Sequence, residues 1–533
     1  MDFTKPTIEY GDLWPLLVVF GVACAGVLVE AFAPRTRRFL IQTVLAAAGV
    51  LAALVGTILV ARDLDVLGDG VARGAIDVEG TIVVDGPTVF FWGMLLVFGL
   101  GGILLFAERR LEGGVSAFAG QAAALPGTEA ERQASTRGLE HTEVYPLMMF
   151  ALGGMMLFPA ANDLLTLFVA LEVLSLPLYL LSGLARRRRL LSQEAALKYF
   201  MLGAFSSGFF LYGAALVYGF SGSMGFSQIN EAVRDDLGNQ TLLLIGLGML
   251  SVGLLFKVGA APFHSWTPDV YQGAPTPVTA FMAAGTKIAA FGAMLRLFYV
   301  AFGSERWSWQ PMLWVMAILT MLVGAVLAIV QTDMKRMLAY SSVAHTGFLL
   351  TGVLGVQQAS ELADGEVTSL QAVLFYLVTY GFSIIGAFAV VTLVRDSGGE
   401  ATQFVRWRGL GRRSPLVAGL FAFFLLSMAG IPLTAGFVGK WAVFTVALAA
   451  GAWPVVIAAI LCSIIAVFFY VRVILLMFFD DDDVTAQGEV ASVTKPSVLT
   501  SATILVGVAA TLVLGVVPGP VLDLAANAGQ FVR

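Results

Sequence analysis

The sequence predicts an all-α, polytopic membrane protein with about fourteen transmembrane helices. Of its 533 residues, 58% are hydrophobic and only 13% are charged, whereas soluble globular domains carry about 25% charged residues. Apolar residues recur in runs of about 20, the length of helix that crosses the hydrocarbon core of a bilayer. The runs are continuously apolar rather than alternating, which favours helices over a β-barrel.

The apolar runs define the predicted spans in order along the chain. Their approximate bounds are residues 13–33, 39–61, 88–107, 142–160, 163–184, 195–219, 241–266, 277–301, 311–330, 335–356, 368–394, 415–450, 453–479 and 497–519. The seventh and twelfth runs are too long or too interrupted to be single straight helices. We therefore divide the chain into residues 1–141 (three spans and a linker), 142–301 (spans four to eight), 302–479 (spans nine to thirteen) and 480–533 (a linker and the last span).

The distribution of basic residues between the linkers predicts the orientation of the chain. Lys335 and Arg336, at the start of the tenth span, are counted with the linker before it. Linkers after odd-numbered spans then hold 19 Lys and Arg residues, including the run Arg186–Arg189, whereas the opposite face holds six. Positively charged loops stay in the cytoplasm, so we expect a multi-pass protein of the bacterial cell (inner) membrane with both termini on the outer face. The N-terminus has no basic segment or small-residue cleavage site, so the first span should be retained.

Several classes of site are not indicated by the sequence. The two cysteines, Cys24 and Cys462, lie in separate apolar runs and give no CxxC pair and no metal-ligand spacing. We find no P-loop, no dinucleotide-binding fingerprint and no basic patch suited to nucleic acid. We therefore expect this chain to bind no metal, no cofactor and no nucleic acid.

Ionisable residues inside the spans are the strongest functional signal. Six basic residues lie within predicted spans, and two of them, Arg296 and Arg472, are close enough to helix ends for their side chains to snorkel to the interface. Glu172 is the one acidic residue deep in a predicted span. The other four basic residues are Lys198, Lys257, Lys287 and Lys440.

A charge at the bilayer centre costs about 2.5–3.5 kcal/mol, so these residues need an explanation. Buried Lys–Glu pairs could serve packing alone, but one central carboxylate leaves three of the four lysines without a permanent acidic partner. Burial and repulsion between like charges both favour the neutral amine. The lysines are therefore predicted to lie beside water, to lose their protons or to pass protons on.

Two of the predicted spans carry proline close to lysine. In GLLFKVGAAPFHSW, Pro262 follows Lys257 by five residues and is expected to break the helix, while in SMAGIPLTAGFVGKW, Pro432 precedes Lys440 by eight. Carbonyl groups that a break frees at membrane depth must be satisfied by water or ions. His264 is then a candidate proton carrier near neutral pH, the alternative being a structural hydrogen bond.

The two interrupted spans, the seventh and the twelfth, are five places apart. This spacing predicts two five-helix repeats, each with a broken helix, and because five is odd the second repeat would be inverted in the membrane. Glu172, Lys257, Lys287 and Lys440 could then line one path across the membrane.

Five segments carry a resemblance to a known family. They are FKVGAAPFHSWTPDVYQGAPTPVTAF, LEVLSLPLYLLSG, EAALKYFMLGAFSSGFFLYG, DMKRMLAYSSVAHTGF and LSMAGIPLTAGFVGKW. They closely resemble the antiporter-like, proton-pumping subunits of respiratory NADH:quinone oxidoreductase (complex I), over essentially Thr142–Phe479. WTPDVYQGAP looks like the N-type branch of that family, and the twelfth-span lysine and the chain end without a long lateral helix suit the same branch.

The resemblance implies roles for the candidate residues. Glu172 would pair with Lys257, and Lys198 would modulate that pair unless Glu194, one turn earlier, simply neutralises it. Lys287 would be the central connecting lysine and Lys440 the terminal one. The histidines His264 and His345 would line the hydrated axis.

The resemblance also implies partners. Redox chemistry in other subunits would drive the protons, so NAD, FMN, iron–sulfur clusters and quinone are expected in partner subunits and none in this chain. Neighbouring antiporter-like subunits and lipid should surround it, with the linker 111–141 and the loop 62–85 serving contacts. Alternatives are a subunit of a cation/proton antiporter, a subunit of a membrane-bound hydrogenase-type complex, and a structural scaffold.

Overall fold

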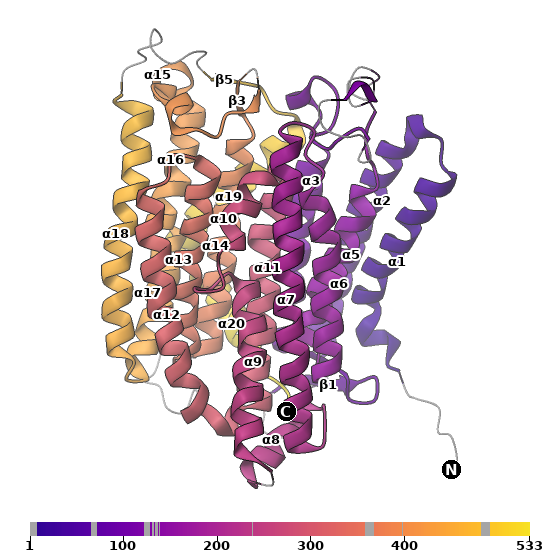
Figure 1. Ribbon diagram of the computed structural model, residues 1–533, viewed down its shortest axis with the longest axis vertical. Helices are drawn as coiled ribbons and strands as arrows, with labels where there is room; N and C mark the ends of the chain where they lie inside the picture. Colours follow the sequence, from indigo (N-terminus) through magenta and orange to yellow (C-terminus); the bar gives the residue numbers. More distant parts are fainter. Residues whose placement is uncertain are drawn as a thin grey trace.

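The computed structural model describes residues 8–65, 72–121, 139–236, 238–357, 367–396, 398–480 and 491–533, with a few positions between 128 and 137. Long helices run side by side along one direction (Figure 1). Among the described residues, 11 helices are long and apolar enough to cross a membrane, or up to 12 if a bent pair is one span. The all-α membrane class is therefore confirmed. Parts of the linker 111–141 and of the loop 62–85 lie outside the described residues.

Three helices and a hairpin open the fold. The helices are α1 (Tyr10–Phe32), α2 (Arg35–Asp63) and α3 (Gly86–Phe106), followed by the short 3-10 turn η1 (Arg110–Glu112). Between α2 and α3, strands β1 (Gly74–Asp77) and β2 (Ile82–Asp85) pair antiparallel, with Gly74 opposite Asp85. Asp85 caps α3, because its carboxylate accepts a hydrogen bond from the Thr88 backbone N–H.

The segment 142–301 supplies the first broken helix. Its elements are α5 (Val144–Ala160), α6 (Leu164–Ser182), α7 (Arg189–Ser221), α8 (Phe226–Arg234), α9 (Gln240–Val258), α10 (Trp266–Gly273), α11 (Thr276–Arg296) and the π-helical turn η2 (Leu297–Ala301). The predicted seventh span (241–266) covers α9 and the turn after it and ends at Trp266, where α10 begins.

The rest of the chain supplies the second broken helix and closes the bundle. Its elements are η3 (Gly303–Glu305), α12 (Arg306–Ile329), α13 (Met334–Val353), α14 (Ser369–Val391), β3 (Val394–Asp396), β4 (Gly399–Glu400), η5 (Phe404–Trp407), α15 (Leu410–Arg413), α16 (Pro415–Ala429), α17 (Ala435–Ala449), α18 (Trp453–Phe478), β5 (Ser492–Val493), α19 (Val498–Val516) and α20 (Gly519–Asn527). Strands β4, β3 and β5 form a small antiparallel sheet. The predicted twelfth span is α16 followed by α17.

Each predicted span coincides with a helix or a broken pair of helices, but length and hydropathy alone support fewer than fourteen. The helices α5 and α17 are shorter apolar helices, and α13 opens with Lys335 and Arg336. The predicted count and the inverted repeats therefore stay predictions.

Glycine rather than proline ends the first half of each broken helix. Helix α9 stops at Val258 because Gly259 adopts the left-handed conformation (φ 72°), and α16 stops before Gly430 (φ 87°), which is the usual backbone geometry of a helix C-terminus. The expected break at Pro262 is thus displaced by three residues. Pro262 lies in the turn between α9 and α10, where its missing N–H costs no helical hydrogen bond.

Helices α11 and α14 form the centre of the bundle, since almost all of their residues are buried by surrounding helices. Close approach of neighbouring helices depends on small residues. At Gly324 of α12, an added Cβ would lie 2.4 Å from the Ala344 backbone nitrogen of α13. Because Lys287 lies in the middle of α11, it is enclosed by the surrounding helices.

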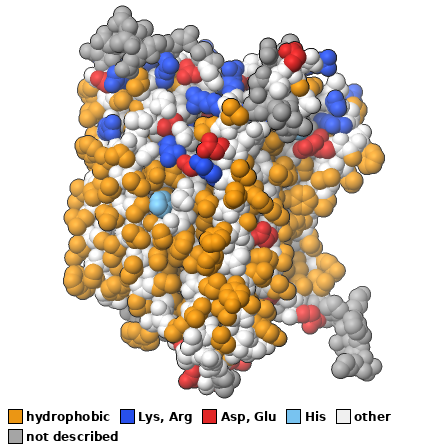
Figure 2. Space-filling view, in the orientation of Figure 1, with side chains coloured by type: hydrophobic (Ala, Val, Ile, Leu, Met, Phe, Trp, Pro, Cys, Tyr) orange, Lys and Arg blue, Asp and Glu red, His pale blue; other side chains and the backbone are white. Residues whose placement is uncertain are grey.

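Both ends of the described chain lie at the end of the bundle that carries the β1–β2 hairpin (Figure 1). The Glu9 backbone N–H donates to the Asp77 carboxylate at 3.1 Å, and Ala72 forms a β-bridge with Gln530. Lys and Arg side chains gather at the opposite end, above a broad apolar belt (Figure 2). As the sequence predicts, both termini lie at one end of the bundle and the basic residues gather at the other end. Which end faces the cytoplasm stays a prediction.

The prediction that Arg296 snorkels is wrong. Its side chain is fully buried, and its guanidinium donates to the Asp85 carboxylate at 2.7 Å, to the Thr88 hydroxyl at 2.7 Å and to the Pro159 carbonyl at 2.7 Å. Its carbon Cζ also lies 4.6 Å from the ring centre of Phe531. A fixed carboxylate is within reach, so the charge is paired inside the protein through Nε and Nη2 and the side chain does not need the interface, although Nη1 has no hydrogen-bond partner among the described residues.

Candidate functional site

Lys257 lies in the last turn of α9, at the negative end of the helix dipole. Its side chain is buried, and its Nζ donates to the Ser175 hydroxyl of α6 at 2.6 Å. The rings of Tyr179, Tyr199 and Phe256 lie 5.5–5.8 Å from Nζ. The aromatic faces and the negative end of the helix dipole both favour a positive charge here.

The direct pair between Glu172 and Lys257 is not formed among the described residues. Ser175, which holds the lysine, is one turn after Glu172 on the same helix, and its hydroxyl donates to the Leu171 carbonyl. The Glu172 oxygen Oε1 is buried and has no hydrogen-bond partner in the described part of the chain. The carboxylate is thus one helical turn from the serine that holds the lysine, and it makes no hydrogen bond or ion pair with the lysine among the described residues.

A small cavity connects Lys257 to the next lysine. Lys257 and Lys287 both line it, together with Tyr271, Thr286 and Ser342. Its volume is about 10 Å³, about the space that one water molecule needs, and its hydroxyl and carbonyl groups give such a water partners.

Lys287 sits in the middle of α11 and is buried. Its Nζ donates to the Ser342 carbonyl at 2.6 Å and to the Thr346 hydroxyl at 2.6 Å, and it lies 4.9 Å from the ring centre of Tyr380. The Thr346 hydroxyl in turn donates to the Val258 carbonyl at 2.7 Å. Thr346 therefore joins Lys287 on α11 to the broken end of α9.

His345 continues the polar path along α13. Its Nδ1 lies 2.7 Å from the Tyr376 hydroxyl and its Nε2 lies 3.3 Å from the Tyr470 hydroxyl. Both ring nitrogens are thus in contact with groups that can donate or accept a proton. The Tyr470 hydroxyl also binds the Ser341 hydroxyl, so α13, α14 and α18 meet at this histidine.

Lys440 lies on α17 at the second break. Its buried Nζ donates to the Ala429 carbonyl, the last of α16, at 2.9 Å and to the Ser463 hydroxyl at 2.9 Å. It also lies 4.9 Å from the ring centre of Phe348, which packs edge-on against His345 at 5.7 Å. Both broken helices therefore place a lysine amine at the C-terminal end of their first half: Lys257 comes from that half itself, and Lys440 comes from the second half.

Two of the predicted site residues lie outside this buried path. Lys198 is about half exposed, and its Nζ contacts Glu194 at 2.8 Å and Asp269 at 2.9 Å, so both carboxylates neutralise it. His264 is only partly buried in the turn between α9 and α10; its ring lies 6.2 Å from Tyr340, and its Nδ1 has no hydrogen-bond partner among the described residues.

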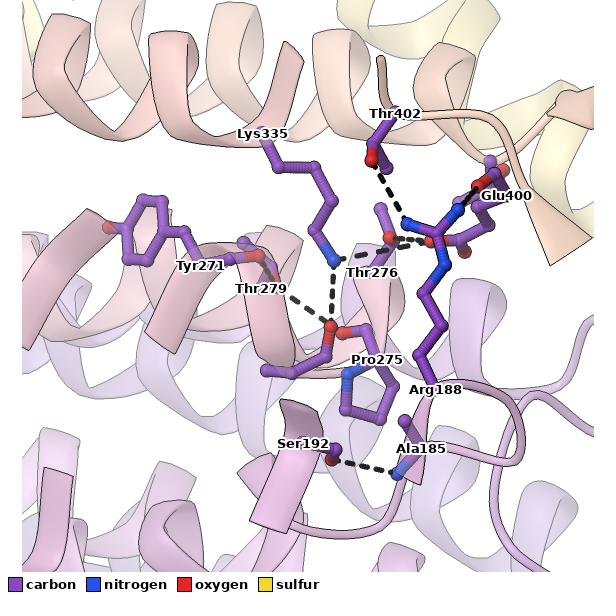
Figure 3. A network of polar contacts seen from close by, with 12 residues as sticks. Ala185, Arg188, Ser192, Tyr271, Pro275, Thr276, Thr279, Lys335, Glu400 and Thr402 are labelled. Carbon is purple, nitrogen blue, oxygen red and sulfur yellow. Dashed lines mark hydrogen bonds and ion pairs between the residues drawn. The ribbon is translucent and has the colours of Figure 1, made fainter. Parts of the chain in front are cut away.

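Lys335 is a buried lysine that the sequence reasoning placed in a linker. It opens α13, only 2% exposed, and its Nζ donates to the Ala274 carbonyl at 2.7 Å and lies 4.0 Å from the Glu400 carboxylate. Figure 3 shows it pointing toward the start of α11, where the Thr276 hydroxyl also binds Glu400. The DMKR motif does not indicate this burial, which comes from the segment after β4: the Met334 backbone N–H donates to the Thr402 carbonyl at 2.6 Å, and Asp333 forms a β-bridge with Gln403.

A cavity of about 50 Å³ opens at this place on the basic end of the molecule, with room for a few water molecules. Arg188 borders it and holds the loop in position, donating to the Glu400 carbonyl at 3.0 Å and to the Thr402 hydroxyl at 3.1 Å (Figure 3). The cavity joins Lys335 to the surface that carries the arginine run.

The buried path therefore has a definite chemical character. Lys257, Lys287 and Lys440 are held by hydroxyl and carbonyl oxygens, and no carboxylate of the described chain pairs with any of them. Such ligands stabilise an ammonium group only in part. The arrangement can hold a proton at several places without fixing it at one.

Comparison with known proteins agrees with this geometry. The family model described as NADH:quinone oxidoreductase/Mrp antiporter, TM, matches residues 161–466. The chain is 92% identical over 533 residues to NADH-quinone oxidoreductase subunit N of Nocardioides sp., covering 100% of both chains. It is 33% identical to a chain of respiratory complex I from Thermus thermophilus with bound aureothin, with TM-score 0.73, covering 97% of this chain and 100% of that one.

A chain of the Mrp complex from Dietzia sp. has the same fold, with TM-score 0.76 at 20% identity, covering 98% of this chain and 97% of that one. At that identity the likeness concerns the fold alone, so the relatives named subunit N decide the branch. This chain belongs to the NADH:quinone oxidoreductase/Mrp antiporter family and, within it, to the subunit N branch.

Proposed function

We propose that this chain is a membrane-arm subunit of a bacterial proton-pumping NADH:quinone oxidoreductase and that protons cross it along the buried lysine axis. The observation that carries the proposal is the shared cavity: Lys257 and Lys287 line one space of about 10 Å³, so a single water molecule could connect them. Beyond Lys287, α13 offers Thr346 and His345 as further polar groups. Lys440 lies on the other side of the Phe348 ring, which carries no proton itself, so water would have to complete this last part of the path.

The lysines act as a coupled series. Two ammonium groups beside one small cavity repel each other, so a proton on Lys257 favours the neutral form of Lys287, and the reverse. The Glu172 carboxylate, one turn from Ser175, biases the first site toward the charged form. A change in the position or charge of that end would therefore move protons along the series.

The driving reaction lies in partner subunits. The described residues contain no group of three or more His, Cys, Asp or Glu side chains that could hold a metal ion, and NAD, FMN, iron–sulfur clusters and quinone are assigned to those partners. Each proton moved against the membrane potential costs about 2.3 kcal/mol per 100 mV. That energy must reach this chain as a mechanical or electrostatic change.

The cavity at Lys335 is the proposed cytoplasmic end of the path. Lys335 and Ser342 are seven residues apart on α13, which is about 10 Å along the helix and places them on one face. Lys335 borders the outer cavity and Ser342 borders the inner one. Protons taken up at the basic end would thus reach Lys287 along the surface of α13.

The central test uses two variants of Lys287 in the assembled complex, reconstituted in vesicles, with proton transfer measured per NADH oxidised. Lys287→Met removes the proton site, whereas Lys287→Arg keeps the charge on a group that does not release its proton. We expect both to lower the proton-to-electron ratio clearly and coupled activity by about tenfold, which equals a barrier rise of about 1.4 kcal/mol.

Lys198→Met is the matched control, because this lysine is exposed and bound by two carboxylates, and it should keep most of the pumping. A normal ratio in Lys287→Arg would show that only the charge matters and would overturn the proposal. Copurification tests the assembly: recovery of this chain with NADH-oxidising and iron–sulfur subunits supports it, whereas recovery with antiporter subunits alone would favour the cation/proton antiporter.

A further inference from the structure

A large cavity lies away from the lysine axis, on the side of the bundle formed by α2, α3, α14 and α20. Its volume is about 390 Å³, within the range of about 300–1,000 Å³ that small-molecule sites occupy. Its walls are almost entirely aliphatic and aromatic, and no carboxylate lines it. The Thr57 hydroxyl on one wall is already used, donating to the Ala53 carbonyl at 2.8 Å.

The cavity extends through one leaflet of the membrane. It follows α3 from Gly86, next to the β1–β2 hairpin, to Phe98, where Val378 and Phe382 of α14 close it. Twelve residues of helix correspond to about 18 Å, and half of a hydrocarbon core is about 15 Å. The cavity therefore reaches from the interface on the side of the chain termini to about the middle of the bilayer.

One positive charge stands at the interfacial end. Arg73, just before β1, lines the cavity there, and its side chain is exposed. Its guanidinium makes no hydrogen bond or ion pair with the described residues, unlike Arg296 nearby in the fold. A guanidinium of this kind binds phosphate oxygens with two parallel hydrogen bonds.

We propose that this cavity binds one acyl chain of an anionic phospholipid, with the headgroup phosphate at Arg73. The depth of one leaflet, the apolar walls and the single cation at the headgroup level all fit this ligand. This site is independent of the proposed proton path.

Two variants separate the apolar and the charged parts of the site. Gly93 lines the cavity on α3, and an added Cβ there meets nothing within 4 Å, so Gly93→Leu should fill the cavity without a clash. Gly248→Leu on α9 is its control, because that glycine has equally open surroundings and lies outside the cavity. Arg73→Gln removes the charge, with Arg62→Gln, an exposed arginine at the end of α2, as its control.

The experiment delipidates the purified complex in mild detergent, adds back phosphatidylglycerol or phosphatidylcholine, and counts retained lipids by native mass spectrometry. We expect the wild type to retain at least one phosphatidylglycerol more than Gly93→Leu, and Arg73→Gln to bind that lipid about tenfold more weakly, as expected for the loss of a charge-assisted hydrogen bond. Both controls should match the wild type.

Equal lipid counts in wild type and Gly93→Leu would overturn the proposal. So would equal retention of phosphatidylcholine and phosphatidylglycerol by the wild type, or a quinone or a partner helix found in the cavity. If Gly93→Leu fails to assemble, the comparison of Arg73→Gln with Arg62→Gln in the two lipids decides the question alone.

Discussion

At the scale of single residues, hydroxyl groups rather than carboxylates hold the buried lysines. The Ser175 hydroxyl accepts a hydrogen bond from Lys257 Nζ at 2.6 Å, and the Thr346 hydroxyl accepts one from Lys287 Nζ at the same distance. A hydroxyl can accept from an ammonium or donate to a neutral amine, so one side chain suits both protonation states. A carboxylate would hold the proton more strongly and slow its release.

Ser175→Ala tests this role. The change leaves Lys257 without its hydrogen-bond acceptor, so the ammonium loses roughly 1.5–3 kcal/mol of stabilisation, and we expect proton-coupled NADH oxidation to fall by about tenfold or more. Ser182→Ala is the control, because Ser182 is also buried on α6 and also donates to the carbonyl four residues earlier, but it contacts no lysine. Steady-state activity in coupled and uncoupled vesicles measures the effect, and equal rates for the two variants would contradict it.

The sequence predicts the residues of the axis better than their contacts. Lys257, Lys287 and Lys440 are recognisable because a charge in an apolar run has few explanations. Lys335 is not, because its burial depends on the segment that follows β4, which is remote in the sequence and has no motif. The prediction for Arg296 is wrong for the same reason. Its partner Asp85 comes from a hairpin more than 200 positions away, and a position near a helix end alone suggests snorkelling.

At the scale of elements, Asp85 joins three parts of the fold. It caps α3, pairs with Arg296 of α11 at 2.7 Å, and accepts a hydrogen bond from the Val532 backbone N–H at 3.0 Å. The hairpin, the central helix and the C-terminal residues thus depend on one carboxylate. Sequence reasoning found the helices but could not find this connection, because none of its members is near another in the chain.

Asp85→Asn should destabilise the subunit strongly. Asparagine still caps a helix, but the buried Arg296 would lose its counter-charge, and breaking a buried pair from one side costs about 3–5 kcal/mol. Asp163→Asn is the control, since Asp163 caps α6 through the Leu165 and Thr166 N–H groups and has no basic partner in the described part of the chain. The temperature at which the purified complex releases this subunit should drop for the first variant only. A double change, Asp85→Asn with Arg296→Met, should recover part of the loss, because it removes the uncompensated charge.

At the scale of the whole molecule, the charge distribution and the positions of the chain ends predict the same orientation in the membrane. Basic side chains gather at the end that carries α15, β3 and β5 (Figure 2), and both chain ends meet the hairpin at the other end. Positively charged loops remain in the cytoplasm, so the hairpin and both termini should face outward. The cavity at Lys335 then opens to the cytoplasm, as the proposed direction of uptake requires.

Single cysteines test this orientation. In a background with Cys24→Ser and Cys462→Ser, Arg37→Cys lies in the first turn of α2 and Asp235→Cys lies between α8 and α9, and both positions are exposed. The reagent is a membrane-impermeant maleimide, added to cells whose outer layers have been made permeable but whose cell membrane is intact. It should label Asp235→Cys and leave Arg37→Cys unlabelled until the cell membrane is opened. The reverse pattern would place the arginine-rich end outside, and the path would then take up protons from the wrong side. Labelling of both positions in intact cells would place them on the same side of the membrane. That result requires an even number of crossings between them, contrary to the five long helices α2, α3, α5, α6 and α7 of the described chain.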